Sequence, residues 1–229
     1  GTTLPKDKDL DGCDLSDLLL KDPTDPNLVK NKDGKPRDTM MWHFPHSVAL
    51  ESTIRMGGYK LVRNYNHRFD ERTTELELYQ LYKMDNGKQV RVDIEEANNL
   101  GSQHPQLSKE LNERLSSILN EMDASYPYYN PQARRVGAEK NLIPKVISHE
   151  IQNETVTFSV REQGAKIVRA DLIYTNNGGK KYEEWYRIKG KEKTKGTISF
   201  NLPEGSTHYY INLIDENNFL VSYPETPDY

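Results

Sequence analysis

The chain has 229 residues, of which 34% are hydrophobic, and its formal net charge is −4. This length fits one large domain or two small ones, and the low hydrophobic content favours two small domains or a piece that packs against another domain. The basic residues are dispersed, which argues against nucleic acid as a main partner because phosphate binding needs clustered Lys and Arg. No apolar run reaches the roughly 18 residues of a membrane-spanning helix, so we expect no membrane span.

Residues 1–130 predict a small α+β domain behind an extended N-terminal segment. A short helix or turn is expected near Leu18, and a long helix begins at Pro105, after which leucines recur at helical spacing. Gly57 and Gly58 separate two strand-like runs and predict a two-residue hairpin. The expected fold is an antiparallel sheet of about four strands with this one long helix against it. The strands are expected at 42–44, 53–56, 59–62 and 76–81.

Residues 131–144 predict a linker, and residues 145–229 predict an all-β domain. Turn residues separate its short strand-like runs, and Trp185 is expected to fill its core. The pattern Tyr209-x-Ile211-x-Leu213 resembles that of fibronectin type III domains, and about seven short strands are typical of such an immunoglobulin-like β-sandwich. The runs lie at 145–152, 154–161, 166–175, 181–188, 196–201, 207–214 and 218–223.

Several short motifs follow one another in a recognisable order between residues 10 and 131. In this order they resemble the C-terminal subdomain of sulfatases, the sulfate-ester hydrolases of the alkaline phosphatase superfamily. Two positions depart from the family pattern, since Gly58 stands where Asp or Asn is usual and Gln80 where Asp is common. The motifs are Leu10-Asp11-Gly12-Cys13-Asp14-Leu15, Trp42-His43-Phe44-Pro45-His46, Ile54-Arg55 with Tyr59-Lys60-Leu61, Glu77-Leu78-Tyr79, and Asn98-Asn99-Leu100.

The resemblance implies a C-terminal fragment of a secreted or periplasmic sulfatase that hydrolyses sulfate esters of carbohydrates. In that family a cysteine within Cys-x-Pro/Ala-x-Arg becomes formylglycine and acts beside a calcium ion, and both belong to the missing N-terminal catalytic domain. Cys13 has neither the Pro or Ala nor the Arg of that motif, so we expect an apolar core thiol there. The fragment itself is expected to hold no catalytic residue, metal or cofactor. Its expected partners are the missing domain and the sulfated carbohydrate.

His43 and His46 are the candidate substrate-binding residues. The resemblance implies that this subdomain lines the substrate cleft, and an imidazole next to an aromatic ring suits a sugar hydroxyl or sulfate. The alternative is that both histidines are structural members of the sheet. Their spacing is not that of a helical zinc-binding pair, so no metal site is expected.

Arg55 and Lys60 are candidate anion contacts. A two-residue turn places them directly opposite each other, and such like charges are unfavourable by up to about 1 kcal/mol. An anion is therefore expected between them. It would be Glu75 or Glu77, a carboxylate of the missing domain, or a substrate anion.

Two other functions remain open from the sequence. The chain would be a carbohydrate- or protein-binding module without a hydrolase role, or a fragment of a related phosphatase or phosphonate hydrolase. Tyr126, Tyr128 and Tyr129 are expected to pack at the domain junction, and the alternative is an exposed sugar-stacking platform.

Overall fold

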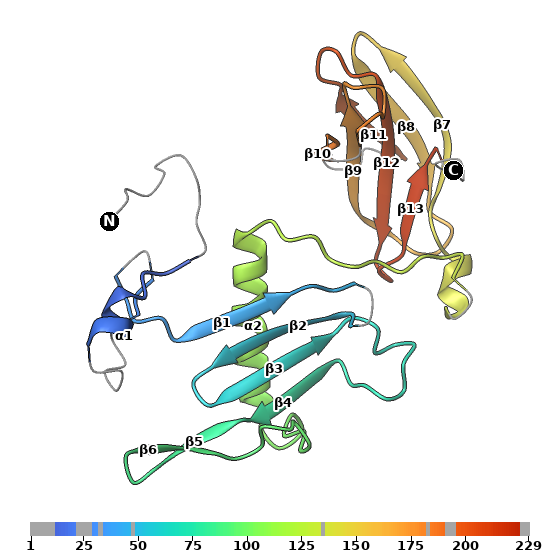
Figure 1. Ribbon diagram of the computed structural model, residues 1–229. Coiled ribbons are helices and arrows are strands. Elements are labelled where there is room, and N and C mark those ends of the chain that lie inside the picture. The colour runs from blue at the N-terminus through green and yellow to red at the C-terminus, as the bar shows by residue number, and fades with distance from the viewer. Residues whose placement is uncertain are drawn as a thin grey trace. The chain divides into compact units, whose positions relative to one another are not determined.

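The computed structural model divides into two compact units, Gly1–Ser125 and Tyr126–Tyr229 (Figure 1). Antiparallel sheets and one long helix make up most of the regular structure of both units, which confirms a β-rich fold with one helix in its first half. Leu10 and Asp11 of the first sulfatase-like motif lie outside the described residues. The structure describes residues 12–21, 29–31, 34–46, 49–133, 136–181, 184–190 and 196–224.

A four-stranded antiparallel sheet organises the first unit, with its strands in the order β1-β2-β3-β4. The predicted hairpin forms, because Met56 pairs with Tyr59 across the two glycines. Gly57 takes a φ of 58°, which an L side chain rarely adopts. The sequence therefore located all four strands of this sheet. Their bounds are β1 Thr39–His43, β2 Glu51–Met56, β3 Tyr59–Asn64 and β4 Leu76–Gln80.

The long helix α2 (Pro105–Glu121) covers one face of this sheet, as predicted (Figure 1). Arg63 of β3 reaches it and donates hydrogen bonds to Asn112 and Ser116, which identifies the face that meets the helix. Leucine and isoleucine side chains fill the space between the two layers and are fully buried. They are Ile54, Leu61 and Leu78 from the sheet, and Leu111, Leu115 and Leu119 from the helix.

Two smaller elements complete the first unit. The short helix α1 (Ser16–Leu20) forms where a helix or turn was expected. The hairpin of β5 (Tyr82–Asp85) and β6 (Lys88–Arg91) was not predicted. Its turn holds Asn86 and Gly87, both with positive φ. An Asn-Gly pair is a strong hairpin signal, so the sequence did contain the information.

The second unit has two antiparallel sheets, with the strand orders β10-β9-β12-β13 and β11-β8-β7. One hydrophobic core cluster takes residues from both sheets, such as Phe158 from β8 and Leu213 from β12. Within the run predicted at 181–188, strand β10 begins at Tyr186, and residues 182–183 lie outside the described residues. The bounds are β7 Lys145–Gln152, β8 Thr155–Arg161, β9 Ile167–Thr175, β10 Tyr186–Lys189, β11 Thr197–Asn201, β12 His208–Asp215 and β13 Leu220–Tyr223, with a short 3₁₀ helix at Ala138–Asn141.

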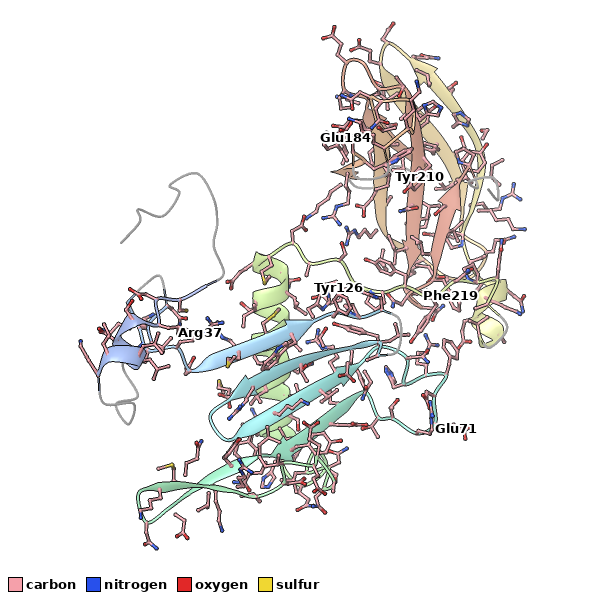
Figure 2. The ribbon with its side chains drawn as sticks, in the orientation of Figure 1. Arg37, Glu71, Tyr126, Glu184, Tyr210 and Phe219 are labelled. Carbon is pink, nitrogen blue, oxygen red and sulfur yellow. The ribbon has the colours of Figure 1, made fainter. Side chains whose placement is uncertain are left out.

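Trp185 does not fill the core, contrary to expectation. It precedes β10 and packs its ring against Tyr210 of β12, with 5.5 Å between ring centroids. Tyr210 is labelled in Figure 2. Tyr210 alternates with the core residues Tyr209 and Ile211, so it lies on the opposite face of its strand. The two rings are therefore on the outer face of their sheet.

The described residues of the segment 126–144 belong to the second unit. Tyr129 packs on Phe219, with ring centroids 5.7 Å apart, and its backbone exchanges hydrogen bonds with Asn218 and Leu220. Further along, the Ala165 N–H donates to the Leu142 carbonyl. The tyrosine-rich stretch thus holds the start of the second unit against the turn before β13.

Candidate functional site

The sheet of the first unit has a second face, turned away from α2, which we call the far face. Side chains alternate along each strand, so Met40, Trp42 and Arg55 share this face with Lys60 and Tyr79. The far face is covered over β3 and β4, where Tyr79 is 8% exposed, but it is open over β1, where Trp42 is 49% exposed. It carries the two candidate anion contacts, Arg55 and Lys60.

His43 lies on the other face, toward α2, and both of its ring nitrogens are engaged. Nδ1 is 2.6 Å from the Ser52 hydroxyl and Nε2 is 2.8 Å from the Ser125 carbonyl oxygen. A carbonyl only accepts, so Nε2 carries a proton, and in the neutral ring Nδ1 accepts from the Ser52 hydroxyl. Ser52 in turn lies 2.8 Å from the Tyr65 hydroxyl. The geometry favours the structural alternative for this histidine.

The Ser52–His43 pair does not form a nucleophile and its base. The Ser52 side chain is completely buried, so no substrate atom reaches its hydroxyl. A Ser–His pair acts in catalysis only where the hydroxyl faces a reacting carbon, phosphorus or sulfur atom. The network instead joins strands β1 and β2 to the segment that follows α2.

His46 is exposed and lies beyond the end of β1. Its ring packs on Phe44, with centroids 3.7 Å apart, and Phe44 is itself 70% exposed. Both ring nitrogens of His46 are without a hydrogen bond to any described residue. The two candidate histidines therefore do not come together. Only His46 offers its imidazole to solvent.

Arg55 and Lys60 are direct partners across the β2–β3 hairpin, as the turn predicted. The anion at Lys60 is Glu96, whose carboxylate oxygens lie 2.6 and 2.8 Å from Nζ. The expectation of Glu75 or Glu77 was wrong, because Glu77 accepts from the Tyr79 hydroxyl instead. Glu96 comes from a loop whose position relative to the sheet cannot be predicted from the strand pattern.

A backbone turn fixes Glu96 at this position. Its φ is 57°, in the left-handed region, so the local backbone needs outside support. The carboxylate of Asp93 accepts from the backbone N–H groups of Ala97 and Asn98. These bonds, first that to Ala97, also hold the pKa of Asp93 below its ordinary value. The loop therefore holds an acidic side chain over the sheet.

Arg55 is held differently. Its guanidinium lies over the ring of Tyr82, 4.9 Å from the centroid. Within the described part of the chain it has no carboxylate partner and no hydrogen-bond acceptor. Tyr82 is fixed in turn by Gly58, whose carbonyl accepts from the N–H groups of Leu81 and Tyr82.

The surroundings of Gly58 explain why this position departs from the sulfatase pattern. A Cβ at this position would lie 2.1 Å from the Tyr82 carbonyl oxygen, which no side chain tolerates without a backbone shift. An Asp or Asn there would displace the start of β5. Glycine is therefore required by the close approach of the unpredicted β5–β6 hairpin.

Cys13 is not a core thiol, contrary to expectation. It is only partly buried, and Nη1 of Arg37 lies 2.9 Å from its sulfur. Among the described residues, no group of three or more His, Cys, Asp or Glu side chains is arranged to hold a metal ion. No helix in the described ranges is long and apolar enough to cross a membrane.

The site combines predicted and unpredicted residues. His46, Arg55 and Lys60 could be selected from motif and turn geometry. Glu96 comes from a loop without such a signal, and Tyr82 comes from the hairpin whose Asn86-Gly87 signal was missed. In comparisons with known proteins, no family model and no curated protein matches the chain.

Proposed function

We propose that this chain is the C-terminal part of a sulfatase that hydrolyses sulfate esters of carbohydrates. In this proposal it supports a catalytic domain and lines the substrate cleft, and it is catalytically silent alone. The formylglycine and the calcium ion would belong to the missing N-terminal domain, and the whole enzyme would be secreted or periplasmic. The ordered motifs of the first unit are the basis of this assignment.

The open part of the far face is the structural observation that supports it. The face toward α2 buries Ile54 and Leu61 completely, whereas Met40 and Trp42 on the far face are 48% and 49% exposed. Contiguous exposed apolar side chains can mark an interaction surface. A sheet covered by a helix on one face and by a neighbouring domain on the other would leave this pattern when the neighbour is absent.

His46 is the cleft-lining histidine in this proposal, and His43 supports the sheet. The exposed Phe44 ring offers a surface for a sugar ring, and the His46 imidazole beside it would bind a hydroxyl or sulfate oxygen. Arg55 and Lys60 lie on the far face and are not neighbours of the Phe44–His46 ring pair.

For the second unit we propose an immunoglobulin- or fibronectin III-like β-sandwich. The support is its strand order in two sheets and the single core cluster to which both contribute. In the same proposal, residues 145–229 are the sandwich, the segment 131–144 connects it to the sulfatase-like residues 1–130, and Arg134 and Arg135 of this segment lie outside the described residues.

The coding sequence upstream of Gly1 tests the sulfatase proposal. We expect it to encode Cys-x-Pro/Ala-x-Arg and the carboxylates that bind calcium. The full-length protein should release p-nitrophenol from its sulfate ester, and the 229-residue chain, supplied with calcium, should not. Turnover by the chain alone, or an upstream domain of another class, would contradict the proposal. An upstream Thr or Ser nucleophile with two metal sites would indicate the related phosphatases.

The His46→Ala variant of the full-length enzyme tests the role in the cleft. Its kcat/KM on the natural glycan should fall by about 10- to 100-fold, which corresponds to the loss of about 1.4–2.8 kcal/mol of transition-state binding. Turnover of a small aryl sulfate, which does not reach beyond the sulfate pocket, should be nearly unchanged. Equal losses on both substrates would refute a role limited to glycan binding.

The second unit favours one alternative, a carbohydrate-binding module. Trp185 and Tyr210 present two packed rings on the outer face of a sheet, which suits stacking of a sugar. A glycan array with the whole chain and its Trp185→Ala variant tests this function. Glycan binding that is lost in Trp185→Ala would favour the carbohydrate-binding module. Equal binding by the variant and the unmodified chain would exclude this alternative.

A further inference from the structure

The chain contains two Asn-Gly pairs, Asn86-Gly87 and Asn177-Gly178, and the structure holds them in different ways. In such a pair the backbone nitrogen of the glycine can attack the side-chain carbonyl carbon of the asparagine, because glycine has no Cβ that blocks the approach. The attack closes a five-membered succinimide ring and releases ammonia. Whether it occurs in a folded protein depends on how firmly both groups are held.

Asn86 and Gly87 form the exposed turn of the β5–β6 hairpin, which projects beyond the sheet of the first unit (Figure 1). Neither the Asn86 side chain nor the Gly87 N–H forms a hydrogen bond to a described residue. A Cβ built on Gly87 would meet no atom within 4 Å, so the space around the turn is open. Both reacting groups are therefore unrestrained by neighbours and accessible to water.

Ring closure requires rotation of the Asn86 backbone, so the turn has to open locally. The strands Tyr82–Asp85 and Lys88–Arg91 have four residues each and are mostly exposed, and a two-stranded hairpin without a third strand is marginally stable in water. Its attachment to the sheet lies at the other end, where the N–H groups of Leu81 and Tyr82 donate to Gly58. The tip can therefore open while the first unit stays folded.

Asn177 is restrained at both groups that would react. Its Nδ2 lies 2.9 Å from Oε2 of Glu184, and a carboxylate oxygen only accepts, so this bond fixes the orientation of the amide. The same bond is the first cause of the lowered pKa of Glu184. The Gly178 N–H donates to the Thr207 hydroxyl at 2.9 Å. The attacking nitrogen and the leaving amide group are therefore both held in place.

We propose that Asn86 is a site of spontaneous deamidation in the folded protein and that Asn177 is protected from it. The Gly87 nitrogen bonds to Cγ of Asn86, the Cγ–Nδ2 bond breaks, and the proton of the Gly87 N–H leaves with the amide group as ammonia. Water then adds to one of the two ring carbonyls and opens the ring to aspartate or isoaspartate. Water is the only other reactant. The modification does not depend on the sulfatase proposal.

The products change the hairpin in two ways. Both place a carboxylate next to Asp85, and it is charged at neutral pH because an ordinary Asp has a pKa of about 3.9. Isoaspartate also adds a methylene group to the backbone, so a two-residue turn no longer joins Asp85 to its partner Lys88. We expect the strands to separate from the tip, whereas the hydrogen bonds to Gly58 persist.

Peptide mapping by mass spectrometry tests the proposal on the whole chain, incubated in mildly alkaline buffer. In the folded chain, conversion at Asn86 should be at least about tenfold faster than at Asn177, which corresponds to about 1.4 kcal/mol in activation free energy. In the chain unfolded by urea, the two pairs should convert at similar rates. That control separates protection by the fold from effects of the flanking residues.

Thr207→Val tests the cause of the protection. This variant removes the hydroxyl that accepts from the Gly178 N–H and keeps the size of the side chain. Conversion at Asn177 should accelerate by about three- to tenfold, the range expected from the loss of one hydrogen bond. Conversion at Asn86 should stay as it is in the unmodified chain, so each variant sample contains its own control.

Other outcomes would overturn the proposal. Equal rates at the two pairs in the folded chain would show that the contacts of Asn177 give no protection. An Asn86 that stays intact in the folded chain, while the unfolded chain converts it, would show that the turn does not open. An unchanged rate at Asn177 in Thr207→Val would exclude the Gly178–Thr207 bond as the restraint.

Discussion

The two units of this chain bury their sheets in different ways. In the second unit, two sheets contribute to one core, and Phe158 and Leu213 are fully buried within it. In the first unit, one helix covers one face of one sheet, and the far face is closed over β3 and β4 but exposes Trp42 over β1. The second unit buries its core between two sheets, whereas the first buries its core between a sheet and a helix and leaves Met40 and Trp42 half-exposed on the far face.

Core truncations test whether the two units are independent, and they should have the largest effects. Phe158→Ala should cost the second unit about 3–5 kcal/mol, and Leu115→Ala should cost the first unit about 2–5 kcal/mol, because each leaves a cavity. Calorimetry should show two transitions, with each variant lowering only its own. A single transition that both variants lower equally would mean that the units fold as one.

His43 and His46 form a matched pair within the first unit. His43→Ala removes the bonds to Ser52 and Ser125 and should cost about 1–3 kcal/mol. His46→Ala lies at an exposed site and should change stability by less than about 0.5 kcal/mol. Urea unfolding measures both. Equal costs would contradict the division into a structural and an exposed histidine.

Gly58→Ala tests how firmly the β5–β6 hairpin is held against the sheet. The added methyl group meets the Tyr82 carbonyl oxygen, so the hairpin must shift, at a cost of about 1–3 kcal/mol. Hydrogen exchange should accelerate at Leu81 and Tyr82, whose N–H groups bond to Gly58. Gly57→Ala is the comparison, since it strains φ without a steric clash. Unchanged exchange at Tyr82 in Gly58→Ala would argue against this contact.

Tyr79 gives the smallest expected effect, a loss of stability at high pH. Burial first, and then its hydrogen bond to Glu77, raise the pKa of the Tyr79 hydroxyl above its ordinary value of about 10. The folded state keeps this proton longer than the unfolded state does. Its contribution is therefore complete below about pH 10 and is lost as the pH rises beyond it. Tyr79→Phe should reduce the loss of the first unit's free energy of unfolding above about pH 10. Tyr210→Phe, in the second unit, should leave that loss unchanged.

Sequence patterns predicted the positions of strands more successfully than they predicted contacts between side chains. The strand β7 matches its predicted range of 145–152, and all four strands of the first sheet were located, because alternation and turn residues are local signals. The β5–β6 hairpin was missed although Asn86-Gly87 announces it. Its strands are mostly exposed and so lack the alternation on which the other predictions depended.

The contacts of the candidate site depend on distant parts of the chain. Glu96 reaches Lys60 across 36 residues of sequence, from a loop whose backbone conformation no residue pattern reveals. Trp185 was assigned to the core because a large aromatic residue is usually buried, but a position just before a strand can face outward. Strand register gave the Arg55–Lys60 pair, while tertiary packing determined their partners.

The pairing of Tyr129 with the turn before β13 has a mechanical consequence. Tyr129 donates to the Asn218 carbonyl and accepts from the Leu220 N–H, so the first residues of the second unit are fastened to its last strands. A pulling force that enters the second unit from its N-terminal side meets these two hydrogen bonds and the Tyr129–Phe219 ring contact, together with the Ala165–Leu142 hydrogen bond, before it reaches β7. These contacts would therefore carry a load before the strands of the two sheets do.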